Sequence, residues 1–324
     1  MENKITEFYK ETSQFTCLGK YKEEAIDLWV NKCDKSLKKL CFYLMNTTVH
    51  RVIIQMALNG ERVDDYGDFS YIDYRTPMSE DDIFLTASSM FCEIFRRDEK
   101  GFYIGRPVEK RLNLTCRYIS VLTSAILKAN GIPCRCRAGW ARYLRKNKCL
   151  DHWVNEYWNN EENRWVMFDM DDLYDREYMN YKFYSENKIA DEYLDFGKEQ
   201  FYTAAEAWLE YRKDKKFIDK FQYGSSTASA EEVLKYLFLD FLSVMNFEVN
   251  YKFAPLYFSG SISKLSEEKL KEIDELAILM LDIDENFYKL KEIYDINPKY
   301  RMLLSPLVGA SNFELLIKNK NYNV

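Results

Sequence analysis

The feature that most constrains the fold of this chain is a cysteine at the start of a helix, with two strand-like segments after it. Over residues 116–129, apolar side chains recur with the spacing of one helix face, and Gly131 followed by Pro133 predicts where that helix ends. Residues 151–158 and 164–169 are rich in aromatic side chains, and the polar segment between them predicts a hairpin. We therefore expect a helix followed by two paired strands.

Three side chains in this segment could carry chemistry. Thr115 is the expected N-cap, so Cys116 would lie in the first helical turn, where the helix dipole and unpaired amides favour a thiolate. His152 could take the thiol proton, and hairpin pairing would bring Asp169 opposite or diagonal to it. Each residue alone is commonly structural, as a buried thiol, a strand histidine or a turn carboxylate. Their joint occurrence favours a Cys-His-Asp triad.

The chain has one other histidine, His50. Its neighbours belong to a stretch with helix-like spacing, which favours a packed or capping role. A single histidine with no other ligand type near it makes a poor metal site, so we expect no metal there.

These motifs resemble the transglutaminase-like superfamily. In that family a nucleophilic cysteine opens a helix that closes on Gly-Ile-Pro-Ala-Arg, and His-Ala-Trp-Val and Trp-Val-x-x-Asp strands follow. The corresponding blocks here are Gly131-Ile132-Pro133-Cys134-Arg135, His152-Trp153-Val154 and Trp165-Val166-Met167-Phe168-Asp169. The similarity is closest to an uncharacterised bacterial branch of the superfamily. By this resemblance Cys116 is the nucleophile, His152 the base and Asp169 the group that orients the base.

The resemblance implies an α+β fold with a papain-like core, in which the helix bearing the cysteine packs on an antiparallel sheet. It implies thiol-dependent acyl chemistry on a peptide or protein substrate, by hydrolysis or transamidation of an amide or isopeptide, and we expect no cofactor. Calcium is not implied, because the sequence contains no suitable binding loop. Three positions depart from the family pattern: Thr115 replaces Gly or Asp, Cys134 replaces Ala, and Trp140 replaces Phe. None of them removes a catalytic group.

Three consecutive regions are expected along the chain. Residues 1–95 would form a mainly helical N-terminal region, 96–185 the catalytic core, and 186–324 a helical extension packed on that core. Within these regions, residues 1–18 are expected to be an extended lead-in. Periodicity predicts helices over residues 21–31, 34–58, 200–213, 229–246, 263–281 and 282–295.

Net charge, the length of apolar runs and the number of cysteines limit the classes of partner and the compartment that we expect for this chain. The formal net charge is −6, which gives no support to broad nucleic-acid binding, since that usually requires a basic surface. No apolar run of about 18 residues or secretory leader is expected, so we predict no membrane partner. Eight cysteines in such a chain are expected to be reduced thiols in the cytoplasm.

Two non-catalytic functions are alternatives. The chain could be a binding or scaffolding protein on a transglutaminase-like fold, because a fold does not fix a function. It could also be a structural zinc protein, since Cys134, Cys136, Cys149 and His152 are zinc ligand types. The Cys-x-Cys spacing is not the usual zinc knuckle, and zinc would take His152 out of the catalytic role.

Overall fold

The structure is a computed structural model that describes residues 2–60, 67–73, 76–77, 79–171, 193–197, 199–251 and 261–301. The chain forms two compact units. We call them the nucleophile unit (Glu7–Arg135 and Val154–Phe196) and the sheet unit (Met1–Thr6, Cys136–Trp153 and Gly197–Val324). The division into regions 1–95, 96–185 and 186–324 stays a prediction.

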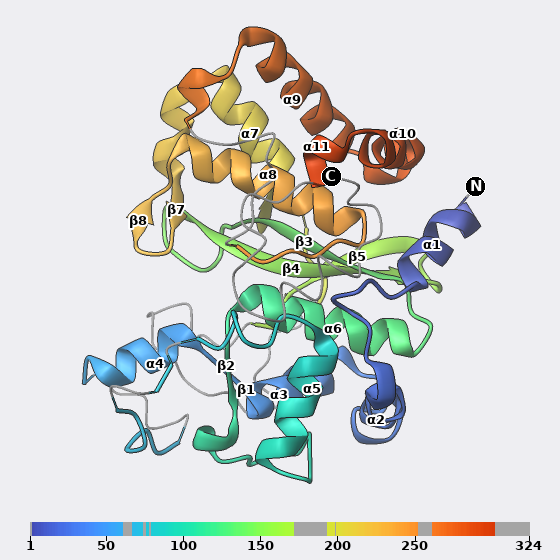
Figure 1. Cartoon of the computed structure of the whole chain (residues 1–324), viewed down its shortest axis with the longest axis vertical. Coiled ribbons are helices and arrows are strands. Elements are labelled where there is room, and N and C mark those ends of the chain that lie inside the picture. The colour runs from blue at the N-terminus through green and yellow to red at the C-terminus, as the bar shows by residue number, and fades with distance from the viewer. Residues whose placement is uncertain are drawn as a thin grey trace. The chain divides into compact units, whose positions relative to one another are not determined.

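Figure 1 labels the helices and strands in chain order. The α-helices are α1 (Glu2–Lys10), α2 (Lys22–Asp27), α3 (Leu37–Thr47), α4 (Arg51–Leu58), α5 (Ala87–Arg97), α6 (Cys116–Ala129), α7 (Ala204–Lys213), α8 (Ala230–Val244), α9 (Glu267–Met280), α10 (Ile283–Ile296) and α11 (Pro298–Arg301). The strands are β1 (Thr48–His50), β2 (Leu112–Leu114), β3 (Cys134–Ala141), β4 (Cys149–Asn159), β5 (Arg164–Phe168), β6 (Phe201–Thr203), β7 (Phe221–Tyr223) and β8 (Ser226–Thr227).

Helix α6 is central to the nucleophile unit. Residues 116–128 are all buried, and α2 and α5 lie against the helix (Figure 1). The helix ends as the sequence predicts. Gly131 adopts a φ of +72°, which glycine takes without steric strain, and the N–H of Ile132 donates to the carbonyl of Leu127 at 3.0 Å.

The predicted hairpin is confirmed in the same unit. Strands β4 and β5 are antiparallel, with Asn155 opposite Phe168 and Asn159 opposite Arg164. Asn163 in the turn has a φ of +52°, a left-handed conformation that asparagine tolerates better than most residues. The register leaves Asp169 directly after the end of β5.

Side-chain hydrogen bonds fasten α6 to β4. The Ser120 hydroxyl donates to the carbonyl of Val154 at 3.0 Å, and the Asn155 amide donates to the carbonyl of Ser120 at 3.0 Å. All three groups are buried, so each bond satisfies a polar atom that water cannot reach. The helix bearing Cys116 therefore packs on a strand of the hairpin, as expected for this fold.

Two short strands before α6 pair in parallel, with His50 of β1 opposite Leu114 of β2. Leu114 is two residues before Cys116. The pairing therefore brings the end of β1 close to the start of α6, although 66 positions separate His50 from Cys116 along the chain.

The sheet unit contains strands in the order β6-β3-β4-β7-β8. Strands β3 and β6 are antiparallel, whereas β4 and β7 are parallel. Gly139 of β3 lies opposite Thr203, and a side chain at this position would collide with the backbone of Tyr202. Glycine is required here because β6 approaches so closely.

A buried ion pair joins β3 to α8 within the sheet unit. The Arg137 guanidinium donates to both oxygens of Asp240 at 2.9 and 3.0 Å, and the N–H of Ala138 donates to the same carboxylate at 2.9 Å. Such a bidentate pair fixes orientation as well as contact. Helix α7 packs against α8 and α9, and α10 packs against α9.

These elements confirm the predicted α+β fold. The helices predicted over residues 21–31, 200–213, 229–246, 263–281 and 282–295 are present with boundaries shifted by a few residues. The single helix predicted over residues 34–58 is wrong, because strand β1 separates α3 from α4. The sheet is mixed, because the β4–β7 pair is parallel where we expected an antiparallel sheet. Residues 2–10 form α1, so the extended lead-in is wrong; Ile5 and Tyr9 lie one helical turn apart and are both buried. No helix in the described ranges is both long and apolar enough to span a membrane.

Candidate active site around Cys116

Cys116 is the first residue of α6, directly after the β2 strand and Thr115. Thr115 has extended backbone angles, so the chain turns from strand to helix at the cysteine. The Cys116 side chain is 7% exposed. The predicted nucleophile therefore occupies the first helical turn, where backbone N–H groups and the helix dipole favour negative charge.

Thr115 does not cap α6 through its side chain, and this part of the prediction is wrong. Its hydroxyl donates to one Asp81 oxygen at 2.8 Å, and its N–H donates to the other at 3.1 Å. Burial raises the pKa of the Asp81 carboxyl, while hydrogen bonds from Ser79 and Thr115 and the charge of Arg117 oppose this shift. Asp81 thus holds the residue that precedes the nucleophile.

Arg117 does not present its charge to solvent beside the thiol. The residue is fully buried, and its guanidinium lies 4.3 Å from the ring centroid of Tyr118 and 5.3 Å from that of Phe15. These are cation–π distances. Arg117 stabilises the packing beneath the start of α6.

Arg106 and Arg111, which lie on the chain's approach to α6, are structural. The Arg106 guanidinium donates to the carbonyls of Lys110, Gly101 and Ile94. Arg111 donates to the carbonyl of Arg106 at 3.0 Å. Both side chains serve the backbone of this loop.

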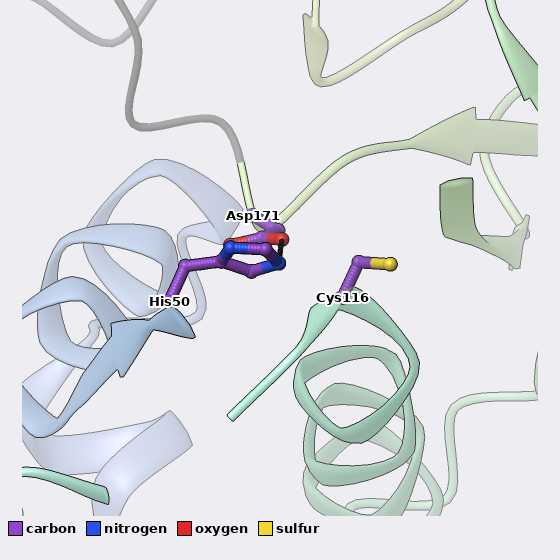
Figure 2. A group of neighbouring side chains, drawn as sticks. All are labelled: His50, Cys116 and Asp171. Carbon is purple, nitrogen blue, oxygen red and sulfur yellow. Dashed lines mark ion pairs between the residues drawn. The ribbon is translucent and has the colours of Figure 1, made fainter. Parts of the chain in front are cut away.

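Figure 2 shows a cluster that the sequence did not predict, formed by His50, Cys116 and Asp171. One nitrogen, sulfur or oxygen atom from each residue lies within 4.8 Å of the other two. His50 Nε2 is 3.6 Å from Asp171 Oδ2, and Figure 2 shows this nitrogen on the side that faces Cys116. The Cys116 sulfur projects from its Cβ away from the imidazole.

His50 is also the N-cap of α4. Its Nδ1 accepts the backbone N–H of Val52 at 3.2 Å, so Nδ1 carries a lone pair and the proton of the neutral imidazole is on Nε2. The predicted capping role is confirmed. The expectation that no other ligand type lies near His50 is wrong, because the β1–β2 pairing brings Cys116 close.

The cluster does not fit a metal ion, although Cys, His and Asp are zinc ligand types. A neutral imidazole that binds a metal through Nε2 carries its proton on Nδ1. Here Nδ1 accepts the Val52 N–H, so metal binding would break the N-cap of α4. The arrangement favours hydrogen bonding over metal binding.

The zinc alternative is disfavoured on separate grounds. Within the described ranges, His50, Cys116 and Asp171 form the one group of three or more ligand side chains that converge closely enough for a metal. Cys136, Cys149 and His152, which share the sheet unit, do not form such a group.

Asp169 lies in a segment that is held by several hydrogen bonds. The residue is 1% exposed, and its N–H donates to the carbonyl of Tyr193 at 2.9 Å. One of its carboxylate oxygens accepts the N–H of Asp171 at 2.8 Å. The Cys41 thiol of α3 donates to the carbonyl of Met170 at 3.6 Å. The predicted orienting carboxylate is therefore buried and fixed.

His152 lies inside strand β4 and is 3% exposed. The ring of Tyr143 is perpendicular to the imidazole, with 6.3 Å between centroids. The preceding Asp151 accepts hydrogen bonds from the Gly224 N–H and the Tyr236 hydroxyl, each at 2.8 Å. His152 belongs to the sheet unit, whereas Cys116 and Asp169 belong to the nucleophile unit. The triad of these three residues stays a prediction.

Comparison with known proteins supports the resemblance. Residues 110–170 match the family model of the transglutaminase-like superfamily, and this segment contains Cys116, His152 and Asp169. The resemblance to that superfamily is confirmed over these residues. No curated protein matches the sequence.

One solved structure aligns with part of the chain and is described as "a Putative Cysteine Protease from Cytophaga hutchinsonii". The TM-score is 0.29 and the sequence identity 15%, over 51% of this chain and 41% of the other. The alignment thus spans less than half the length of that chain.

Proposed function

We propose that the transglutaminase-like segment is the core of a cysteine-nucleophile enzyme that acts on amide or isopeptide bonds of peptides or proteins. Cys116 is the nucleophile, His152 the base, and Asp169 the group that orients His152. The observation that carries the proposal is the position of Cys116 as the first residue of a buried helix, inside the segment that matches the superfamily.

The chemistry follows from this position. The Cys116 thiolate attacks the substrate carbonyl, and the carbonyl π electrons move onto its oxygen. The N–H of Cys116 is a donor for this oxyanion, and losing such a donor costs about 3 kcal/mol of transition-state stabilisation in other acyl-transfer sites. When the intermediate collapses, the C–N bond breaks and His152 returns the thiol proton to the leaving amine.

The product of this first half is a thioester on Cys116. Water that attacks the thioester releases a carboxylic acid, so the enzyme is a hydrolase. A primary amine that attacks it forms a new amide, so the enzyme is an acyltransferase. His152 removes the proton from either acceptor, and the free thiol is restored in both cases.

Trapping the acyl group tests the proposal. The protein is incubated with p-nitrophenyl acetate, quenched in acid and digested, and the acetylated peptide is located by mass spectrometry. We expect acetyl on Cys116 in excess over the exposed Cys17 and Cys92, removed by hydroxylamine as a thioester would be. Glycine ethyl ester, added as acceptor, separates transfer from hydrolysis by the appearance of its N-acetyl derivative.

The control variant is Cys116→Ser, which changes one atom and removes the thiolate. This variant should carry no thioester at position 116. It should release p-nitrophenol only at the slow rate at which exposed nucleophiles such as Cys17 and Cys92 react. Acetyl found only on Cys17 and Cys92 would contradict the proposal. The binding or scaffolding alternative would then be favoured.

A further inference from the structure

We propose that His50 and Asp171 form a positioning pair that holds the carboxylate of Asp169 in the orientation that its catalytic role requires. This inference rests on the proposed function, since it concerns the residue that orients the base. It gives the cluster beside Cys116 a role as support for the orienting carboxylate.

The first link is the fixed imidazole of His50. The Val52 N–H donates to Nδ1 and so fixes the tautomer, which leaves the ring proton on Nε2, the nitrogen that lies 3.6 Å from Asp171 Oδ2. The side chains of His50 and Asp171 are 14% and 2% exposed. In such a shielded place, the attraction between a polar N–H group and a nearby carboxylate is stronger than it would be in water.

The second link is the backbone of Asp171. With its side chain drawn toward His50, its N–H points back at Asp169 and donates to Oδ1 at 2.8 Å. This hydrogen bond restricts the side-chain rotation of Asp169 and so fixes the orientation of its carboxylate. Loss of the imidazole would remove a partner from a buried carboxylate, which favours rotation of Asp171 toward water. The N–H would then leave Asp169.

Two further bonds show that the backbone around Asp169 does not depend on His50 alone. The Asp169 N–H is held by the carbonyl of Tyr193, and Cys41 donates to the carbonyl of Met170. We therefore expect that removing His50 changes the orientation of the Asp169 carboxylate and leaves the segment folded.

A direct role for His50 as the base of Cys116 is the competing assignment. His50 and Cys116 are close, but the lone pair of the imidazole is on Nδ1, which accepts the Val52 N–H. Taking the thiol proton would therefore cost the N-cap of α4. The geometry favours positioning over proton transfer.

A double-mutant cycle tests the inference. His50→Asn keeps a good N-cap residue for α4 but is too short to reach Asp171. It is compared with Asp169→Asn and with the double variant. The measured quantity is the rate at which iodoacetamide alkylates Cys116 at pH 6, with the exposed Cys92 as internal standard.

We expect His50→Asn to slow Cys116 alkylation by about tenfold, within the range of coupling between neighbouring residues. Asp169→Asn should slow it more, and the double variant should match Asp169→Asn alone. Asp171→Asn, which keeps the N–H to Asp169 but loses the charge that faces His50, should resemble His50→Asn. If His50→Asn fails to fold, Asp171→Asn tests the inference in its place.

Two results would overturn the inference. Either the His50 and Asp169 effects multiply in the double variant, which makes His50 an independent catalytic group, or neither His50→Asn nor Asp171→Asn changes the rate. Failure of the proposed function gives a different result, because wild-type Cys116 would then react no faster than Cys92. The inference depends on that function and would be wrong as well.

Discussion

The two histidines of this chain lie in contrasting surroundings. His50 follows a short strand and precedes a helix whose first N–H groups need acceptors, and one of its nitrogens meets that need. His152 lies within β4, where neighbouring strands satisfy the backbone. A histidine that caps a helix through a ring nitrogen gives up the lone pair on that nitrogen, which a general base requires, whereas the backbone of a strand pairs with neighbouring strands and needs no side-chain cap. The comparison is consistent with the roles proposed above, in which His50 positions Asp169 through Asp171 and His152 transfers the proton.

The largest expected effect is the loss of activity when His152 is replaced, and it tests directly whether the two histidines differ in role. His152→Ala should lower kcat for p-nitrophenyl acetate by about 10³-fold or more, as loss of a base does in other nucleophile–base pairs. His50→Asn should lower it by about tenfold. Initial rates at saturating ester measure both. Equal losses in the two variants would remove the distinction between the histidines.

The sheet unit, which contains His152, is expected to depend on a buried ion pair. Asp240→Ala leaves the Arg137 guanidinium without its carboxylate and should cost about 3–5 kcal/mol in the free energy of unfolding. Urea denaturation measures this. The double variant Arg137→Met/Asp240→Leu should recover part of the loss, but not all, because the Ala138 N–H also loses its acceptor. A single variant as stable as the wild type would contradict this role.

A smaller effect on stability tests the capping role of His50. His50→Ala removes the acceptor of the Val52 N–H and should cost about 1 kcal/mol of stability. His50→Asn should cost less, since asparagine caps helices well. Thermal unfolding of the two variants compares them. If His50→Ala were no less stable than His50→Asn, the cap would not contribute.

The smallest expected effect is the pH dependence of stability that arises from Asp81, the residue that holds Thr115. Burial raises the pKa of the Asp81 carboxyl above 3.8. The protonated form therefore stabilises the fold below the unfolded pKa, and this contribution is lost as pH rises through the folded pKa. Asp81→Asn removes the titration. Relative to this variant, the wild type should lose stability as pH rises from about 4 and then level off. A constant difference would contradict the assignment.

Local signals predicted the elements around Cys116 well. The apolar spacing, Gly131 and the polar turn were enough for α6 and the hairpin, because each depends on residues close in sequence. The cluster of His50 with Cys116 and Asp171 could not be predicted. It depends on the parallel pairing of two three-residue strands, and such strands are too short to show a periodic pattern.

The prediction for Thr115 failed for a related reason. A threonine before a helix is a good N-cap candidate on sequence grounds. Asp81, 34 positions earlier, takes its hydroxyl instead. This error comes from a tertiary contact that outweighs a local preference.

We propose that Cys116 is an activated thiol that depends on His152. The most direct measurement is the alkylation rate of all eight cysteines between pH 5 and 9, read by peptide mass spectrometry, in wild type and His152→Ala. An ordinary thiol is mostly protonated and slow at pH 6. We predict that Cys116, although buried, reacts far faster at pH 6 than the exposed Cys17 and Cys92, and that His152→Ala removes this advantage. If Cys116 is no faster than Cys17 and Cys92 in the folded protein, the account is wrong.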